Sequence, residues 1–216
     1  MLAEVLQRVS DARDGAIGVE PSLVITPDSG WTPVAELVRA PYTLLDRLVE
    51  RTAGRWNAPR HVGAALLWKA YGYWHTFPMA LGWALDGRIP IMKFRDTYFR
   101  ETATGISLGA SRISWETGAA AIGAALAESQ EPIVKVLSGM AKVGPRTLWG
   151  STAEAMAHPL TKVVKGDYMR LLREVGKPVD GLVRPTEDGY FRRTCCLWVT
   201  LPDVEACSTC CIPSRN

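Results

Sequence analysis

The stretch VGAALLWKAYGYWHTFPMALGWAL, residues 62–85, is the most apolar part of the chain, and it carries Lys69, His75 and Pro78 near its middle. A lysine at the centre of a membrane-spanning helix costs about 3 kcal/mol on insertion scales, which disfavours a membrane span. A proline inside a helix removes one backbone hydrogen bond and clashes with the preceding turn. We therefore predict that residues 59–86 form a buried or groove-lining helix pair, broken at Pro78.

The segments on either side of this stretch are mainly helical by their periodicity. Before it, the sequence predicts an N-terminal amphipathic helix, a short strand at 22–26, a helix that opens at Thr32-Pro33 and a helix over 41–54. After it, apolar residues interleaved with polar ones predict two or three strands within 89–111. Helical patterns then return in four tracts: TGAAAIGAALAES, PIVKVLSGMAKVG, RTLWGSTAEAMAHPLTKVV and DYMRLLREVG.

These patterns predict an α+β fold: a predominantly helical single domain with a small β-sheet and an irregular C-terminal cysteine segment. The expected division is a helical body over 1–185 and a cysteine segment over 186–216. The chain has 216 residues, of which 47% are hydrophobic, so it can bury a core without disulfides.

The net charge is modest at +3, and the sequence has no dense basic stripe. Nucleic acid is therefore not an expected partner, whereas an anionic small ligand or an acidic protein is compatible with this charge. The first residues, with an acidic Glu4, read as an amphipathic helix rather than a signal peptide. We expect a cytoplasmic location, where free or metal-bound thiols persist.

All five cysteines lie in RRTCCLWVTLPDVEACSTCC (192–211). A Cys-x-x-Cys turn directs two sulfurs at one centre, which is typical of zinc and iron–sulfur sites. The other pair of cysteines is contiguous, and adjacent residues serve a single tetrahedral ion poorly, whereas two sulfide-bridged irons form a longer target. Four thiolates are the usual complement of a [2Fe-2S] cluster. The candidate ligands are Cys195, Cys196, Cys207, Cys210 and Cys211.

The cysteines could also serve in three different ways. A zinc site is possible, although zinc motifs usually have two separated Cys-x-x-Cys hooks. Disulfides are disfavoured by the odd cysteine count and the absence of an apparent secretion signal. Catalytic thiol chemistry needs a nearby base, and His61, His75 and His158 are all remote in sequence.

The cysteine segment resembles the C-terminal signature of the FhuF-type ferric-siderophore reductases, in which a C-C-x10-C-x2-C motif holds a [2Fe-2S] cluster. The residues around the motif, Phe191 to Arg193, Leu197-Trp198 and Pro202, are similar to the family's surroundings, as are the tracts 61–85 and 148–157. The motif itself is matched without insertion by Cys195, Cys196, Cys207 and Cys210.

One position departs from the family pattern. Cys211 stands where many relatives have proline, and proline first appears here at position 213. The resemblance favours Cys210 as the fourth ligand, with Cys211 as a spare thiol, and the competing possibility is a swap between them.

The resemblance implies an enzyme that reduces Fe(III) held by a siderophore, most often of the hydroxamate type, and releases Fe(II) in the cytoplasm. Residues 1–185 would then bind the siderophore. The four motif cysteines would be the catalytic, cofactor-binding and metal-binding residues. The electron donor would be a ferredoxin, a flavoprotein or reduced flavin. A peripheral position at the inner membrane, without a membrane span, is compatible with this role.

Two rival functions come from other classes of protein. One is a binding module stabilised by zinc, with no turnover. The other is an iron–sulfur sensor of redox state or iron that regulates a partner. The absorption spectrum separates the zinc module from the other two, and delivery of Fe(II) to a chelator separates reductase from sensor.

The substrate pocket is less visible in the sequence. Three tryptophans crowd one helical tract with two tyrosines and a histidine, and they could line a groove or, as is more usual for such spacing, pack in the core. Three cations in the strand region could meet an anionic chelate or form a solvated face. The aromatic tract contains Trp68, Tyr71, Tyr73, Trp74, His75 and Trp83. The three cations of the strand region are Lys93, Arg95 and Arg100.

Other candidate functional residues lie next to the cysteines or form a known catalytic motif. Arg192 and Arg193 could raise the potential of a cluster or lie in a solvated turn, and Trp198 could shield it or, more simply, pack in the core. Residues 105–109 spell G-x-S-x-G, the nucleophile elbow of hydrolases. That motif needs a strand leading into a helix, and the turn-like sequence after it disfavours a hydrolase.

Overall fold

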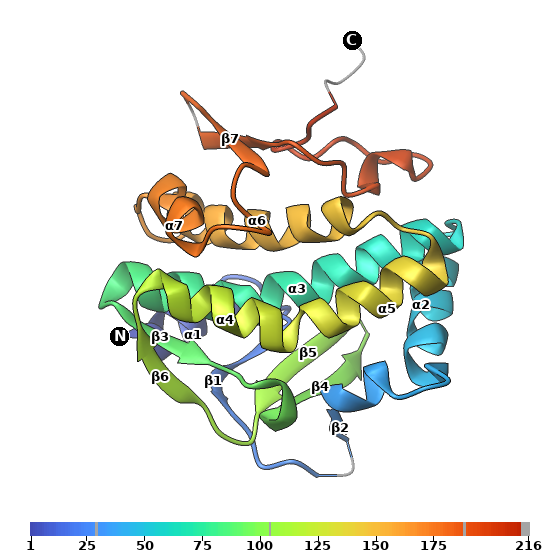
Figure 1. The fold of residues 1–216 in the computed structure, drawn as a ribbon, viewed down its shortest axis with the longest axis horizontal. Helices are drawn as coiled ribbons and strands as arrows, with labels where there is room; N and C mark the ends of the chain where they lie inside the picture. The colour runs from blue at the N-terminus through green and yellow to red at the C-terminus, as the bar shows by residue number, and fades with distance from the viewer. Residues whose placement is uncertain (29, 104, 188, 213–216) are drawn as a thin grey trace.

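One long helix, α3 (Arg60–Leu85), runs through the middle of the molecule (Figure 1). Helix α6 (Pro145–Lys162) lies along one side of α3, and the strands within residues 19–117 lie on the opposite side (Figure 1). This arrangement comes from a computed structural model. It describes residues 1–28, 30–103, 105–187 and 189–212.

Helix α3 is continuous, so the predicted break at Pro78 is wrong. Pro78 is buried within the helix, where its ring leaves the carbonyl of Trp74 without its usual donor. Buried residues run from Val62 to Gly82 on all faces of the helix, and packing of this kind supplies most of a helix's stability in a protein. No helix of the described residues is both long and apolar enough to cross a membrane.

His75 on α3 lies at the centre of a buried hydrogen-bond network. Its Nε2 donates to the carbonyl of Met92 (3.2 Å), and its Nδ1 accepts from the side-chain amide of Gln130 (3.1 Å). The same amide donates to Thr76 (2.8 Å), and Gln130 Oε1 accepts from Thr152 (2.9 Å). Burial lowers the pKa of His75 to about 4, so the imidazole is neutral and the donors and acceptors are matched.

Helix α6 approaches α3 closely because its facing residues are small or aromatic. The buried Ala153 and Ala157 present little side chain at this contact. The indole Nε1 of Trp68 donates to the carbonyl of Leu148 (2.8 Å), and its ring meets Trp149 edge-on with centroids 6.3 Å apart. These contacts fix the position of α6, which carries the cysteine segment on its other side.

The main sheet has four strands in the order β1 (Val19–Val24), β5 (Gly105–Ala110), β4 (Thr97–Thr102) and β2 (Thr32–Pro33). Strand β1 pairs with β5 in parallel, and the other neighbours are antiparallel. The core face of β5 is apolar, because Ile106, like most of the strand, is buried against the helices.

A second sheet pairs β3 (Arg88–Ile91) with β6 (Ser114–Thr117). Strands β3, β4 and β5 together confirm the strands predicted within 89–111. The helix predicted to open at Thr32-Pro33 is instead the short strand β2, followed by a 3-10 helix, η1 (Val34–Val38). A second 3-10 helix, η2 (Phe94–Asp96), precedes β4.

The remaining helices begin and end within a few residues of the periodic tracts in the sequence. Their apolar faces complete one continuous core around α3. They are α1 (Leu2–Asp11), α2 (Thr43–Arg55), α4 (Ala119–Ser129), α5 (Glu131–Ala141) and α7 (Tyr168–Val175).

The C-terminal segment lies on the side of α6 that faces away from α3 (Figure 1). It consists of a hairpin, β7 (Val183–Thr186) and β8 (Gly189–Arg192), followed by irregular chain with a single 3-10 turn, η3 (Trp198–Thr200). The hairpin spans the expected boundary between residues 185 and 186. The α+β class, predominantly helical with a small sheet and an irregular cysteine segment, is confirmed.

Candidate metal centre and adjoining cavity

Arg192, the last residue of β8, anchors the cysteine segment to α6. Its guanidinium is buried, donating from Nη1 to Glu154 Oε2 (2.7 Å) and from Nη2 to Ser151 Oγ (3.1 Å). The other oxygen of Glu154 accepts from the hydroxyl of Thr209 (3.0 Å). The backbone N–H of Arg192 also donates to the carbonyl of Thr209 (2.9 Å). One carboxylate on α6 therefore holds both ends of the segment that carries the thiols.

Gly150 on α6 allows the cysteine segment to lie directly on the helix. A Cβ at this position would be 1.7 Å from Thr194 Oγ1 and 2.9 Å from Thr194 Cβ, distances that no packed side chain tolerates. Gly150, Ser151 and Glu154 all come from the tract 148–157. That tract is thus the part of α6 that contacts the cysteine segment.

The five cysteines are free thiols in two groups. Cys196 shares a hydrogen bond with Cys207, and this bond raises the pKa of Cys196, with burial adding to the effect, while it lowers the pKa of Cys207. These opposite shifts favour the proton on Cys196 and the negative charge on Cys207. Burial and the neighbouring charges of Cys195 and Cys210 raise the pKa of Cys211, which places these three thiols near one another.

Each of the four motif cysteines accepts a hydrogen bond from the residue two positions later. The backbone N–H of Leu197 donates to Cys195 Sγ (3.3 Å), and that of Ile212 donates to Cys210 Sγ (3.4 Å). The backbone of Trp198 likewise donates to the sulfur of Cys196. The hydroxyl of Thr209 donates to Cys207 Sγ (3.7 Å). Such donors stabilise a thiolate.

Cys211 breaks this regularity. Two positions later the chain has Pro213, and proline carries no backbone N–H. Within the residues that the structure describes, the only hydrogen bond to its sulfur comes from its own backbone. The pattern of sulfur hydrogen bonds therefore favours Cys210 over Cys211 as a thiolate ligand.

The thiols are not gathered around one point in the described residues. Across the described ranges, no three side chains of His, Cys, Asp or Glu are grouped so that they could hold a metal ion. The motif cysteines divide between the Cys196–Cys207 pair and the group near Cys211. Two buried donors nearby, Arg192 Nε and Thr194 Oγ1, have no partner in the described structure and could donate to sulfide. In its chemistry, a set of four thiolates with spare donors is the kind that a [2Fe-2S] cluster uses.

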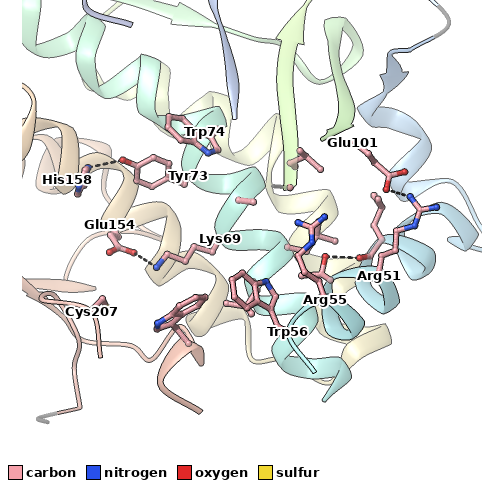
Figure 2. A pocket seen from close by; sticks show the side chains of 18 of the residues that line it. Arg51, Arg55, Trp56, Lys69, Tyr73, Trp74, Glu101, Glu154, His158 and Cys207 are labelled. Carbon is pink, nitrogen blue, oxygen red and sulfur yellow. Dashed lines mark hydrogen bonds and ion pairs between the residues drawn. The ribbon is translucent and has the colours of Figure 1, made fainter. Parts of the chain in front are cut away.

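A cavity of about 470 Å³ adjoins this centre. Figure 2 shows Arg55, the last residue of α2, and the next residue Trp56 on one side, Lys69 of α3 in the middle, and Glu154 and Cys207 on the other side. The volume lies within the range typical of small-molecule sites. Because Cys207 belongs to both features, a ligand in the cavity would contact the thiol centre.

Charged side chains line the cavity unevenly. The carboxylate of Glu101 is paired with Arg51, and that of Glu154 is shared between Arg192 and Lys69, whose Nζ lies 4.0 Å away. Both lining carboxylates therefore have cationic partners. The two remaining lining cations, Arg13 and Arg55, have no ion-pair partner in the described part of the chain, so the cavity carries a surplus of positive charge.

Aromatic side chains form much of the cavity wall. Trp56 and Trp198 meet edge-on with ring centroids 4.9 Å apart. Tyr73 and His158 share a hydrogen bond of 2.7 Å between the hydroxyl and Nδ1. Burial raises the pKa of Tyr73 and lowers that of His158, so both are neutral near pH 7. The wall thus has a flat apolar part and one neutral hydrogen-bonded pair.

The aromatic tract of α3 divides between core and cavity. Trp68, Tyr71 and His75 are buried in the core, as helical spacing usually implies, whereas Tyr73 and Trp74 line the cavity. Trp83 is only partly buried: it packs against the core and contacts Arg170 on its outer side.

Several other candidates lie away from the cavity. Arg100 is bound to Glu20 (2.7 Å), and Lys93 and Arg95 do not line the cavity either. Of the two arginines before the cysteines, Arg192 is buried near the thiols whereas Arg193 is exposed. Trp198 packs against a small core cluster, as the core interpretation expects, and its partly buried ring also lines the cavity.

The G-x-S-x-G motif is part of a regular strand. Ser107 lies in the middle of β5, and its hydroxyl donates to Glu20 Oε1 (3.3 Å). A nucleophile elbow requires a tight turn from strand to helix, so this serine is not one.

Sequence reasoning missed the cavity cations Arg51, Arg55 and Lys69. It also treated His158 as remote from the cysteines, whereas His158 and Cys207 line the same cavity. The signal that could have found Lys69 is its isolation, as the single charge between Arg60 and Leu85 of an otherwise apolar helix. No protein-family model matches the chain, and no curated protein matches it.

Proposed function

We propose that this protein is a [2Fe-2S] oxidoreductase that reduces Fe(III) bound to a siderophore, with hydroxamate groups around the iron, and releases Fe(II) in the cytoplasm. The observation that supports this proposal is that Cys207 belongs both to the group of thiols and to the wall of the cavity. Its sulfur belongs to the thiol centre, and its side chain lines the cavity that adjoins that centre. A chelate in the cavity would therefore be next to the electron donor.

The side chains around the thiols would hold the electron-donating cluster and set its potential. Cys195, Cys196, Cys207 and Cys210 would hold the cluster, and the donors two residues after each would stabilise their negative charge. When bound, a four-thiolate [2Fe-2S] group supplies single electrons at low potential. The buried guanidinium of Arg192 lowers the cost of added negative charge at this centre, which raises its potential. Glu154 keeps that guanidinium in place.

The cavity residues would position the substrate. The cations hold an anionic chelate by charge, and the walls formed by Trp56, Trp74 and Trp198 exclude water from its apolar surface. Ferric iron is a hard cation held tightly by hydroxamate oxygens, whereas ferrous iron is held less tightly and can leave. The electron would come from a ferredoxin, a flavoprotein or reduced flavin.

The first test is the absorption spectrum of protein purified without oxygen, with iron, sulfide and zinc measured on the same sample. We expect red-brown protein with about two irons and two sulfides per chain. Colourless protein with one zinc, made with ample iron in the growth medium, would overturn the proposal and favour a zinc-stabilised module.

The second test mixes reduced protein with a ferric hydroxamate and a ferrous chelator. We expect coloured ferrous complex in proportion to the protein oxidised. A protein that contains the cluster but delivers no Fe(II) would be a sensor rather than a reductase. The two tests thus separate the reductase from the zinc module and from the sensor.

A further inference from the structure

The charge of the cavity restricts the kind of chelate that it can hold. Four cations line it, and the two lining carboxylates are already paired. A neutral ligand would leave Arg13 and Arg55 without an anionic partner once the cavity is filled and water is displaced. An anionic ligand would pair with them, and the low dielectric of a filled cavity strengthens such a pair.

The size and walls of the cavity exclude a simple inorganic anion as its main occupant. A phosphate or sulfate ion would fill little of about 470 Å³. The side chains of Leu48, Leu66, Leu67 and Ile106 line the cavity together with the aromatic rings, so the occupant also has an apolar body. The lining therefore calls for a large ligand with both apolar surface and negative charge.

The position of Arg55, one of the two unpaired arginines, relative to the thiols orients such a ligand. Arg55 lies on α2, whereas Cys207 lies on the opposite side of the cavity (Figure 2). Trp56, next to Arg55 in sequence, meets Trp198 of the cysteine segment edge-on, with ring centroids 4.9 Å apart. A ligand that places an acidic group at Arg55 would direct its other end toward the thiol centre.

We propose that the cavity selects ferric chelates of net negative charge, in which hydroxamates bind the iron and a free carboxylate pairs with Arg55. Carboxylates suit this position because the planar guanidinium binds them through two parallel hydrogen bonds. The proposal rests on the proposed function, since it names the substrate class of the same site. Neutral tris-hydroxamate chelates are then poor ligands of this protein.

The test uses gallium(III) chelates, because gallium has the charge of ferric iron and is not reduced. Binding to the cluster-containing protein is measured by titration calorimetry with three probes. The first is a dihydroxamate with a free carboxylate and net negative charge. The second is a neutral tris-hydroxamate, and the third is a tris-catecholate. We expect the first to bind about tenfold more tightly than the second, as one charge-assisted hydrogen-bonded pair allows.

Two matched variants assign this preference to one residue. Arg55→Gln should lower the affinity for the carboxylate chelate about tenfold and leave the neutral chelate unaffected. Arg47→Gln removes the same charge from an exposed position of the same helix outside the cavity, and it should change neither affinity. Raising the salt concentration should weaken only the anionic chelate, because salt screens charge pairing. Thermal melts of both variants confirm that they are folded.

Equal binding of the neutral and carboxylate chelates would overturn the proposal, as would equal effects of the two variants. Tighter binding of the tris-catecholate would overturn the carboxylate assignment. Binding of gallium chelates needs no electron transfer, so these outcomes are independent of reductase activity. The proposed function fails separately, if the protein lacks the cluster or releases no Fe(II).

Discussion

Arg192 donates a hydrogen bond of 2.7 Å to Glu154, and both side chains are buried between helix α6 and the cysteine segment. This ion pair joins the helical body to the part of the chain that carries every thiol. Breaking a buried pair by removing one partner leaves an uncompensated charge, which costs far more than loss of a surface pair.

Glu154→Gln keeps the shape of the side chain and removes its charge. We expect the free energy of unfolding to fall by about 3 kcal/mol, because the Arg192 guanidinium stays buried without its counter-charge. Chemical denaturation with intact cluster measures this change. Glu131→Gln, which removes an exposed carboxylate paired with Lys135, is the control and should change stability little. Equal effects of the two substitutions would show that the buried pair does not anchor the segment.

Gly150→Ala tests the close approach of α6 to the cysteine segment. The new Cβ would overlap Thr194, so we expect a loss of stability of about 2 kcal/mol, typical of overpacking, and a lower iron content. Gly139→Ala on α5 is the matched control, because a Cβ there meets nothing within 4 Å. It should stabilise the protein by about 0.5–1 kcal/mol through helix propensity. Thermal unfolding distinguishes the two, and stabilisation by both would contradict the close packing of Gly150 against Thr194.

Cys207→Ser and Cys211→Ser test the ligand assignment. We expect the first substitution to abolish the visible absorption and the bound iron and sulfide, since it removes a thiolate that two hydrogen bonds already stabilise. The second should leave all three unchanged. Loss of the cluster in Cys211→Ser, with retention in Cys210→Ser, would show that the fourth ligand is Cys211.

His75 should make the protein less stable in mild acid. The pKa of His75 is about 4 in the folded protein against an ordinary value of 6.5, so between these values the unfolded state binds the extra proton. The contribution of neutral His75 to the free energy of unfolding is therefore fully present above pH 6.5, and it is lost as the pH drops toward 4. We expect a loss of about 2 kcal/mol between pH 7.5 and pH 5 from this residue alone.

Denaturation of two histidine variants at both pH values isolates this contribution. His75→Gln should lose less stability than the parent between pH 7.5 and pH 5, and His61→Gln, at an exposed position, should match the parent. An unchanged acid dependence in His75→Gln would show that the buried network tolerates a charged imidazole.

Most of the helices could be predicted from the sequence because helical periodicity is local. The predicted break at Pro78 is wrong because the local cost of proline is outweighed by the packing of α3 on several sides, which depends on segments far away in the chain. Packing against distant segments also decides where neighbouring aromatic residues of α3 lie. Trp68 faces α6 in the core, whereas Trp74, only six residues later, lines the cavity.

The gathering of the thiols in one segment is visible in the sequence because the five cysteines are close in sequence and chemically distinctive. The cavity was not, because Arg51 and Arg55 follow the pattern of an ordinary solvated helix face beside Leu48 and Val49. Their function depends on α2 lying opposite Cys207, a relationship between residues about 150 positions apart that no local pattern encodes.

The edge-on contact of Trp56 with Trp198 gives the protein an internal optical probe. One ring belongs to the end of α2 and the other to the cysteine segment, so their contact depends on the two parts keeping their relative position. Indole emission responds to polarity and to nearby metal centres, and both rings border the cavity. Binding of a cluster by the thiols, or of a ligand in the cavity, would therefore change the emission of the unlabelled protein, and Trp56→Phe would assign the signal to this pair.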